Sequence, residues 1–213
     1  MATTETRLLL LGAVSIFEPV NGYQIRRELL SWGVEDWANI KPGSIYNGLA
    51  TLAQRGELVR HDLRDGARDV AVYELSEAGR AEFLRLFESA MTDVRPTAPL
   101  AFQTAMSMLP MATREGAVRL LTTRLENLDQ RANAAAREQA EQAATVPPHV
   151  LELMDYWERM GRSERDWLVQ LIDHVEQGAM TFRGEPWGWR PADDDPGWQM
   201  QDDRLRYLAL LGR

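Results

Sequence analysis

The sequence predicts a mainly α-helical protein, with an α+β segment at the N-terminal end and an all-α remainder. Before residue 58 and again beyond residue 100, apolar residues recur every three or four positions, which is the period of a helix. Between these regions, residues 58–64 and 70–75 are short, rich in β-branched residues and alternating in character. Asp65-Gly66 separates the two runs and accepts the positive φ angles of a tight turn, so we expect a β-hairpin there.

Two helices are expected at the N-terminal end. The segment from Thr6 to Phe17 is apolar on all sides, which indicates a buried helix, and Pro19 stops it because proline cannot continue the hydrogen-bond ladder. Asn21 is placed to cap a second helix. The apolar face of this second helix consists of Ile25, Leu29 and Trp32.

A third helix precedes the hairpin and a fourth follows it. Pro42 fits the first turn of the third helix, and Gly56 is placed to end it. Its apolar face consists of Ile45, Leu49 and Leu52. Ser76 is the expected N-cap of the fourth helix, which we expect to pack through Leu84, Phe87 and Met91. The order of three helices and a hairpin is that of a winged helix-turn-helix domain, and a generic α+β core is the alternative.

Beyond Pro99 the pattern is helical throughout. Thr113 can cap a long helix that runs to about residue 144 and carries an a/d heptad seam, typical of a helix packed lengthwise on another. The seam consists of Val118, Leu121, Leu125, Leu128, Ala132 and Ala135. Prolines break the chain at 147–148, and we expect a further interruption at Gly161 before a last long helix.

The C-terminal segment has a different composition. Residues 184–197 are rich in glycine, proline, tryptophan and aspartate, and Asp203–Leu211 is expected to form a short terminal helix. Because the tryptophans Trp187, Trp189 and Trp198 are too apolar for a disordered tail, we expect an ordered arm packed on the helical domain, either of the same chain or across the dimer. The predicted domains are therefore 1–95, 96–183 and 184–213.

Composition excludes several classes of protein. Cysteine is absent, which excludes disulfides and cysteine-ligated metals. The longest apolar run, Leu8–Leu11, is too short to span a membrane, and no signal peptide is evident, so a cytoplasmic location is expected. The three histidines are well separated and no catalytic motif occurs, so we expect no enzyme, no metal site and no cofactor.

The stretch Lys41–Tyr46 resembles the PadR-like family of transcriptional regulators, and so does Asn21–Ile25 before it. The resemblance continues at Arg68, Tyr73 and Gly79 and covers about residues 6–90. Residues 100–182 look like the helical C-terminal domain of one branch of the family. One departure is Asn47, where the family often has proline. The resemblance implies a homodimeric repressor that binds operator DNA, often releases it on meeting a small molecule, and dimerises through helices outside the winged domain.

The third helix would then face the major groove with the side chains opposite its apolar face. Amides suit adenine and a threonine methyl suits thymine, whereas hydroxyls and cations suit phosphates. The expected base-contacting residues are Asn47, Thr51 and Gln54, and the expected phosphate-contacting residues are Lys41, Ser44 and Tyr46. The small residues Gly43, Gly48 and Ala50 would let the helix sit close to DNA. Arg64 and Arg68 bracket the hairpin turn, where a wing reaches phosphates or a minor groove; pairing of one of them with Asp65 or Asp69 is the alternative.

The charge pattern leaves two interpretations open. The chain carries 24 basic and 32 acidic residues, but residues 41–68 carry five basic and three acidic groups. The first interpretation is a homodimeric regulator that binds an inverted-repeat operator in double-stranded DNA, dimerises through Val118, Leu121, Leu125 and Leu128, and responds to a small apolar or aromatic effector. Trp157, Trp167 and the methionines Met106, Met108 and Met111 could line its pocket, but the same residues at helical spacing are more often plain core, which is the favoured interpretation. The alternative is a helical interaction module whose winged domain contacts proteins.

Overall fold

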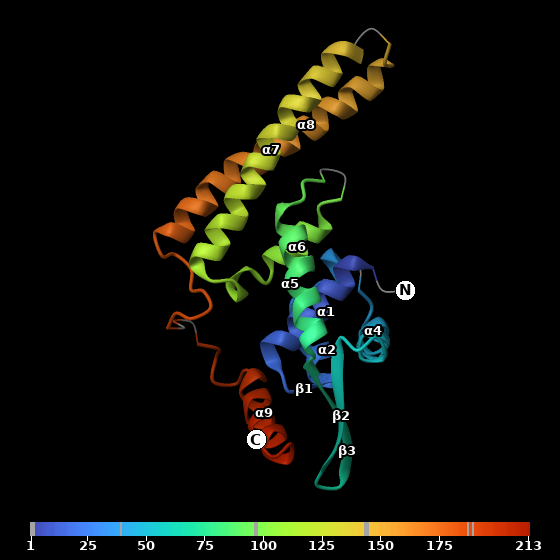
Figure 1. Ribbon diagram of the computed structural model, residues 1–213, viewed down its shortest axis with the longest axis vertical. Coiled ribbons are helices and arrows are strands. Elements are labelled where there is room, and N and C mark those ends of the chain that lie inside the picture. Colours follow the sequence, from blue (N-terminus) through green and yellow to red (C-terminus); the bar gives the residue numbers. More distant parts are fainter. Residues whose placement is uncertain (1–2, 39, 96–97, 143–144, 187, 189) are drawn as a thin grey trace. The chain divides into compact units, whose positions relative to one another are not determined.

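The computed structural model describes residues 3–38, 40–95, 98–142, 145–186, 188 and 190–213 (Figure 1). The chain forms two compact units. The first, here called the winged unit, consists of Met1–Phe87 together with Trp189–Arg213. The second, here called the helical unit, consists of Glu88–Gly188. The C-terminal residues therefore pack with the winged unit, whereas the sequence led us to expect them on the helical domain.

The winged unit combines helices with a small antiparallel sheet, as the sequence predicts. Its elements in chain order are α1 (Thr4–Phe17), β1 (Val20–Asn21), α2 (Gly22–Ser31), α3 (Val34–Trp37), α4 (Pro42–Gln54), β2 (Leu58–Asp65), β3 (Arg68–Leu75), the start of α5 (Glu77–Thr92) and, after the helical unit, α9 (Gly197–Leu210). The strand order is β1-β3-β2, with Leu58 opposite Leu75 and Asp65 opposite Arg68. The long β2–β3 hairpin forms the wing (Figure 1). The short elements β1 and α3 were not expected from the pattern.

Local signals explain where these helices begin. Asn21 caps α2 through a capping box: its side chain accepts a hydrogen bond from the Gln24 N–H, and the Gln24 side chain accepts one from the Asn21 N–H. Pro42 occupies the first turn of α4, where no N–H is needed. The apolar α1 is the centre of the core, with Leu8–Leu11 essentially inaccessible to water.

The start of α5 approaches the base of the wing very closely. A Cβ atom on Gly79 would lie 1.9 Å from the carbonyl oxygen of Glu57, so only glycine fits this position. The backbone N–H of Ser76 donates to the same carbonyl (3.1 Å), and the Ser76 hydroxyl donates to the carbonyl of Gly56 (2.6 Å). The same hydroxyl accepts from the Gly79 N–H, which makes Ser76 the N-cap that we expected.

The expected packing of α5 is wrong at one position. Phe87 and Met91 are buried, but Leu84 is 58% exposed. The buried face of this turn is centred on Phe83 and Phe87, and Leu84 lies about 100° away from Phe83 around a helix of 3.6 residues per turn.

The helical unit contains α6 (Leu100–Met106), a 3₁₀ turn (Leu109–Met111), α7 (Arg114–Gln142) and α8 (Pro148–Glu176). Helices α7 and α8 form a long hairpin (Figure 1). The expected break at Gly161 is absent, because a single glycine costs a helix only about 1 kcal/mol and α8 has its partner helix to offset that cost.

The segment after α8 returns to the start of α7. The N–H of Arg183 donates to the carbonyls of Pro110 and Ala112, and Phe182 is buried. Arg114 pairs with Glu185 at 2.7 Å. The hydrogen bond from the Arg114 guanidinium, together with one from the Phe182 backbone, holds the pKa of Glu185 below its usual range.

A buried arginine fixes the centre of the helical unit. The Arg124 side chain is only 3% exposed and pairs with Glu164 at 2.5 Å. It also donates to the carbonyl of Asp93 at 2.8 Å and lies 3.6 Å from the ring centroid of Phe102. This one cation therefore ties α7, α8, α6 and the end of α5 together.

Candidate nucleic-acid interface

Helix α4 presents one polar face to solvent. Ile45, Leu49 and Leu52 are buried and hold the helix on the core. The six residues expected to contact DNA, all exposed, are Lys41, Ser44, Tyr46, Asn47, Thr51 and Gln54. The structure thus brings these predicted site residues together on one helix with free access to a partner.

Two hydroxyls on this helix already have hydrogen-bond partners. Ser44 Oγ donates to the carbonyl of Lys41 (2.6 Å), and Thr51 Oγ1 donates to the carbonyl of Asn47 (2.8 Å). To donate to a phosphate, either hydroxyl must release its backbone acceptor. The Thr51 methyl needs no such change, so its expected contact with a thymine methyl is compatible with the geometry.

The structure corrects the expected role of Gly48. We expected this glycine to let α4 approach DNA, but it is buried, and a Cβ at this position would lie 2.3 Å from Cδ1 of Leu10. Gly48 therefore permits close packing of α4 on α1. Gly43 is exposed, and nothing lies within 4 Å of the position where its Cβ would be.

The wing carries both predicted arginines near its turn, where Gly66 has a φ of +62°. Arg64 lies 4.0 Å from Asp69, with both side chains largely exposed. This is the ion pair that the sequence left open as an alternative. Such exposed pairs are worth about 0–1 kcal/mol, so Arg64 can exchange Asp69 for a phosphate at little cost.

A groove of about 500 Å³ lies between the wing, the start of α2 and α9. Tyr46 and Arg68, two of the predicted DNA-contacting residues, line it together with Tyr23, which is 60% exposed at the start of α2. The α9 residues in its wall are Gln199, Asp203, Arg206 and Tyr207. Burial disfavours the charge of Arg206, but the carboxylates of Asp203 and Asp65 outweigh burial and hold its pKa above the usual value. Sequence reasoning placed neither Tyr23 nor α9 at this site.

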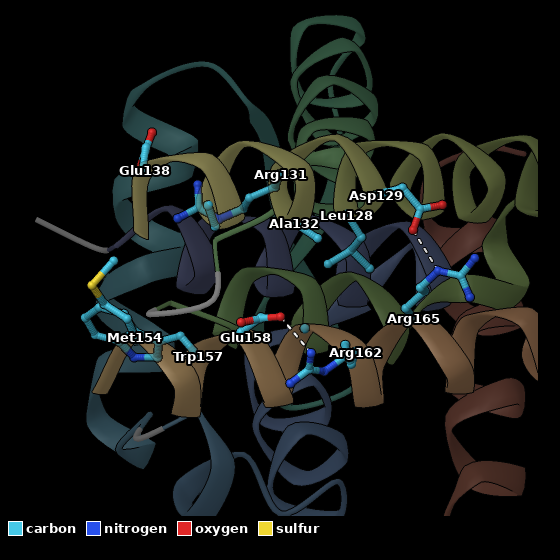
Figure 2. A pocket seen from close by; sticks show the side chains of 12 residues that line it. Leu128, Asp129, Arg131, Ala132, Glu138, Met154, Trp157, Glu158, Arg162 and Arg165 are labelled. Atoms are coloured by element: carbon cyan, nitrogen blue, oxygen red, sulfur yellow. Dashed lines mark hydrogen bonds and ion pairs between the residues drawn. The ribbon is translucent and has the colours of Figure 1, made fainter. Parts of the chain in front are cut away.

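The α7–α8 hairpin contains a second candidate site. A pocket of about 230 Å³ has an apolar lining from Leu128 and Ala132 of α7 and from Met154 and Trp157 of α8. Figure 2 shows these side chains between the two helices, with ion pairs Asp129–Arg165 and Glu158–Arg162 at one end. Trp157 is thus a pocket residue, as one interpretation of the sequence expected. Met108 is buried in the core, and Trp167, which is 43% exposed, does not line this pocket.

Half of the predicted dimerisation seam is buried within the chain itself. Leu121 and Leu128 are buried, whereas Val118 and Leu125 are half-buried. Helix α8 carries a different, exposed apolar stripe, whose successive residues are three, four and seven positions apart. This stripe, here called the α8 stripe, consists of Leu153, Tyr156, Met160 and Trp167. Of these four residues only Trp167 was expected from the sequence, as a residue of a pocket or of the core.

Two further observations concern metal sites and membrane spans. In the described residues no cluster of three or more histidines and carboxylates is arranged to hold a metal ion. Among the described helices none is long and apolar enough to cross a membrane.

The three-helix core, the wing and the exposed polar face of α4 define a winged helix-turn-helix protein. Comparison with known proteins gives the family. Residues 10–85, which lie in the winged unit, match the model of the transcriptional regulator PadR-like family. The family is one of regulators and not of enzymes. No curated protein matches the chain.

Solved structures of PadR-like proteins are also similar to the chain. Bacillus subtilis PadR, in a crystal structure with operator DNA, is 15% identical; the match covers 79% of this chain and 96% of that one, with a TM-score of 0.35. The PadR-like transcriptional regulator BC1756 from Bacillus cereus is 15% identical; the match covers 82% of this chain and 97% of that one, with a TM-score of 0.37.

Proposed function

We propose that the protein is a homodimeric, cytoplasmic repressor that binds an inverted-repeat operator in double-stranded DNA and responds to a small apolar effector. The observation that carries the proposal is the exposed polar face of α4, which presents amides and a threonine methyl beside exposed cations and hydroxyls. These groups are the ones that read base edges and bind phosphates. The match of residues 10–85 to the model of the transcriptional regulator PadR-like family supports it.

Selection of bound fragments from a random pool of double-stranded DNA tests the proposal. A twofold dimer presents two recognition helices, so we expect an inverted repeat with half-site centres about 34 Å apart. Recovery of no preferred sequence, together with no retardation of genomic DNA at low salt, would favour the interaction module instead. That alternative has the net charge of −8 in its support.

Two substitutions separate base reading from phosphate contact. Asn47→Ala removes an amide from the exposed face of α4 and should cost about 1–3 kcal/mol on the preferred base at one position per half-site. Arg68→Ala removes a wing cation and should weaken binding to all sequences alike and flatten the salt dependence. Identical profiles for the two variants would contradict this division of roles.

The α8 stripe supports the homodimer. Four large apolar side chains in a heptad pattern on one exposed helix face are costly to leave in water. A second copy offers the same stripe and can pack against it about a twofold axis, as isologous interfaces do. We place Val118 and Leu125, which are half-buried, at the edge of this interface.

The α7–α8 pocket supports effector binding. Its aromatic and thioether lining suits a flat apolar molecule, and Arg131 in the lining suits an acidic substituent on it. Titration with a planar aromatic acid, followed by tryptophan fluorescence in wild type and Trp157→Phe, tests the site. We expect operator release at saturating ligand in the wild type. A response that is unchanged in Trp157→Phe and Leu128→Ala would place the ligand elsewhere.

A further inference from the structure

Helix α9 docks on the capping box of α2. Gln24 Nε2 donates to Asp203 Oδ2 at 2.8 Å, and Asn21 Nδ2 donates to the hydroxyl of Tyr207 at 2.9 Å. These are the two residues whose side chains cap α2. Tyr207 is only 2% exposed, and Met200 is also buried. Shape and hydrogen bonding therefore specify this contact.

The same helix also reaches the wing. Arg206 Nε lies 3.1 Å from a carboxylate oxygen of Asp65, beside the wing turn, and Arg213 donates to Glu74 of β3 at 2.8 Å. Helix α9 thus bridges the start of α2 and the wing, and Figure 1 shows it beside β1 and the β2–β3 hairpin. In helix-turn-helix proteins the helix before the recognition helix crosses the DNA backbone, and the wing contacts the backbone on the other side.

The chemistry of the contact resembles that of a bound phosphate. The N-terminus of a helix attracts anions through its dipole and its first N–H groups. At the start of α2, Asn21 caps the Gln24 N–H, and the carboxylate of Asp203 accepts from the side-chain amide of Gln24 and lines the groove shared by Tyr46 and Arg68. A phosphodiester strand that contacts Tyr46 and Arg68 has to use this same groove.

We propose that α9 competes with the DNA backbone for the groove between α2 and the wing. In the free protein Asp203 stands where a backbone phosphate binds, and operator binding displaces α9. This inference rests on the proposed DNA binding. The inference adds Asn21 and Gln24 to the residues that contact the DNA backbone. It also gives α9 an inhibitory role.

The charges on α9 favour competition over a supporting role in the interface. Its cation in the groove, Arg206, already pairs with Asp65 and with Asp203. The exposed Asp202 and Arg204, neither of which lines the groove, balance each other in charge. A DNA strand entering beside a docked α9 would meet carboxylates and no unengaged α9 cation in the groove, which is unfavourable for a polyanion.

A matched pair of substitutions tests the proposal in the full-length chain. Asp203→Ala removes the docked carboxylate and should tighten apparent operator binding about tenfold, since a hydrogen bond to a charged group shifts the docking equilibrium by that order. Asp202→Ala removes the same charge one residue away, where no hydrogen bond to α2 is involved, and should change affinity less than twofold. Equal gains from both variants would mean that general charge repulsion explains the effect, and a loss with Asp203→Ala would mean that α9 supports binding. Either result overturns the proposal.

Hydrogen exchange on the wild-type protein gives a second, independent readout. Amides of residues 197–210 should exchange faster when operator DNA is bound, because α9 has left its site. Slower exchange would show that DNA and docked α9 coexist, which also overturns the proposal. If the wild type and both variants bind no DNA, the proposed function itself fails; if all bind equally, only the competition fails.

Discussion

Gly48→Ala tests whether α4 is seated on α1 as described. A new Cβ would lie 2.3 Å from Cδ1 of Leu10, whereas ordinary carbon–carbon contacts are about 3.5–4.0 Å. Leu10 is fully buried, so its methyl group has to rotate into an occupied core or α4 has to move outward. Overpacking costs about 1–3 kcal/mol, and alanine returns about 0.5–1 kcal/mol of helix propensity. We expect a net loss of about 1–2 kcal/mol in the free energy of unfolding.

Urea unfolding followed by tryptophan fluorescence measures this loss, with Gly43→Ala as the control. Nothing lies within 4 Å of the Gly43 Cβ position, so that variant should be as stable as the wild type or slightly more stable. Leu10→Ala should rescue Gly48→Ala in part, and the double mutant should be more stable than the sum of the single effects by about 1 kcal/mol. Equal stability of Gly48→Ala and Gly43→Ala would refute the packing argument. Gly48 would then again be expected to allow close approach of α4 to DNA.

Three further predictions concern the helical unit. Arg124→Leu leaves a carboxylate and a carbonyl without their buried donor and should cost about 3–5 kcal/mol in the free energy of unfolding, measured by urea denaturation. The pKa of Glu185 lies below its usual range in the folded protein, so the ion pair with Arg114 stabilises the fold fully above the unfolded pKa of about 4.3. This stabilisation is lost as pH falls through the folded pKa. The difference in Tm between the wild type and Glu185→Gln should therefore vanish at the acid end of a pH series. Met160→Glu should produce monomers in sedimentation, and Val169→Glu, an exposed position on another side of α8, should leave dimers; dissociation of both or neither would disprove the α8 stripe as the interface.

The sequence predicted the winged core well because its signals are local. The capping residue Asn21, the proline at the start of α4 and the Asp65-Gly66 turn each act on their own backbone within a few residues. The same holds for the exposed face of α4, which follows directly from helical period and three buried residues.

The features that the sequence did not predict depend on contacts between residues far apart in the chain. The sequence shows that position 48 carries no side chain, but it does not show that Leu10 occupies the space beside it. The docking of Asp203 on Gln24 joins residues that are 179 positions apart, and no short-range rule describes such a pair. Trp187 and Trp189, on which part of the argument for an ordered arm rested, lie outside the described residues, whereas Trp198 begins α9 with its indole N–H bonded to the carbonyl of Ala192.

The close contact between Gly79 and Glu57 means that a small rotation at the base of the wing produces a large displacement at its tip. Its base is fixed to the first turn of α5, so the two move as one rigid piece. Strands of eight residues extend about 26 Å at the usual rise, so a 10° rotation at the base displaces the wing tip by about 4–5 Å. Because the start of α5 is fixed to the base of the wing, a tilt of this start displaces the arginines beside the wing turn farther than it displaces the base.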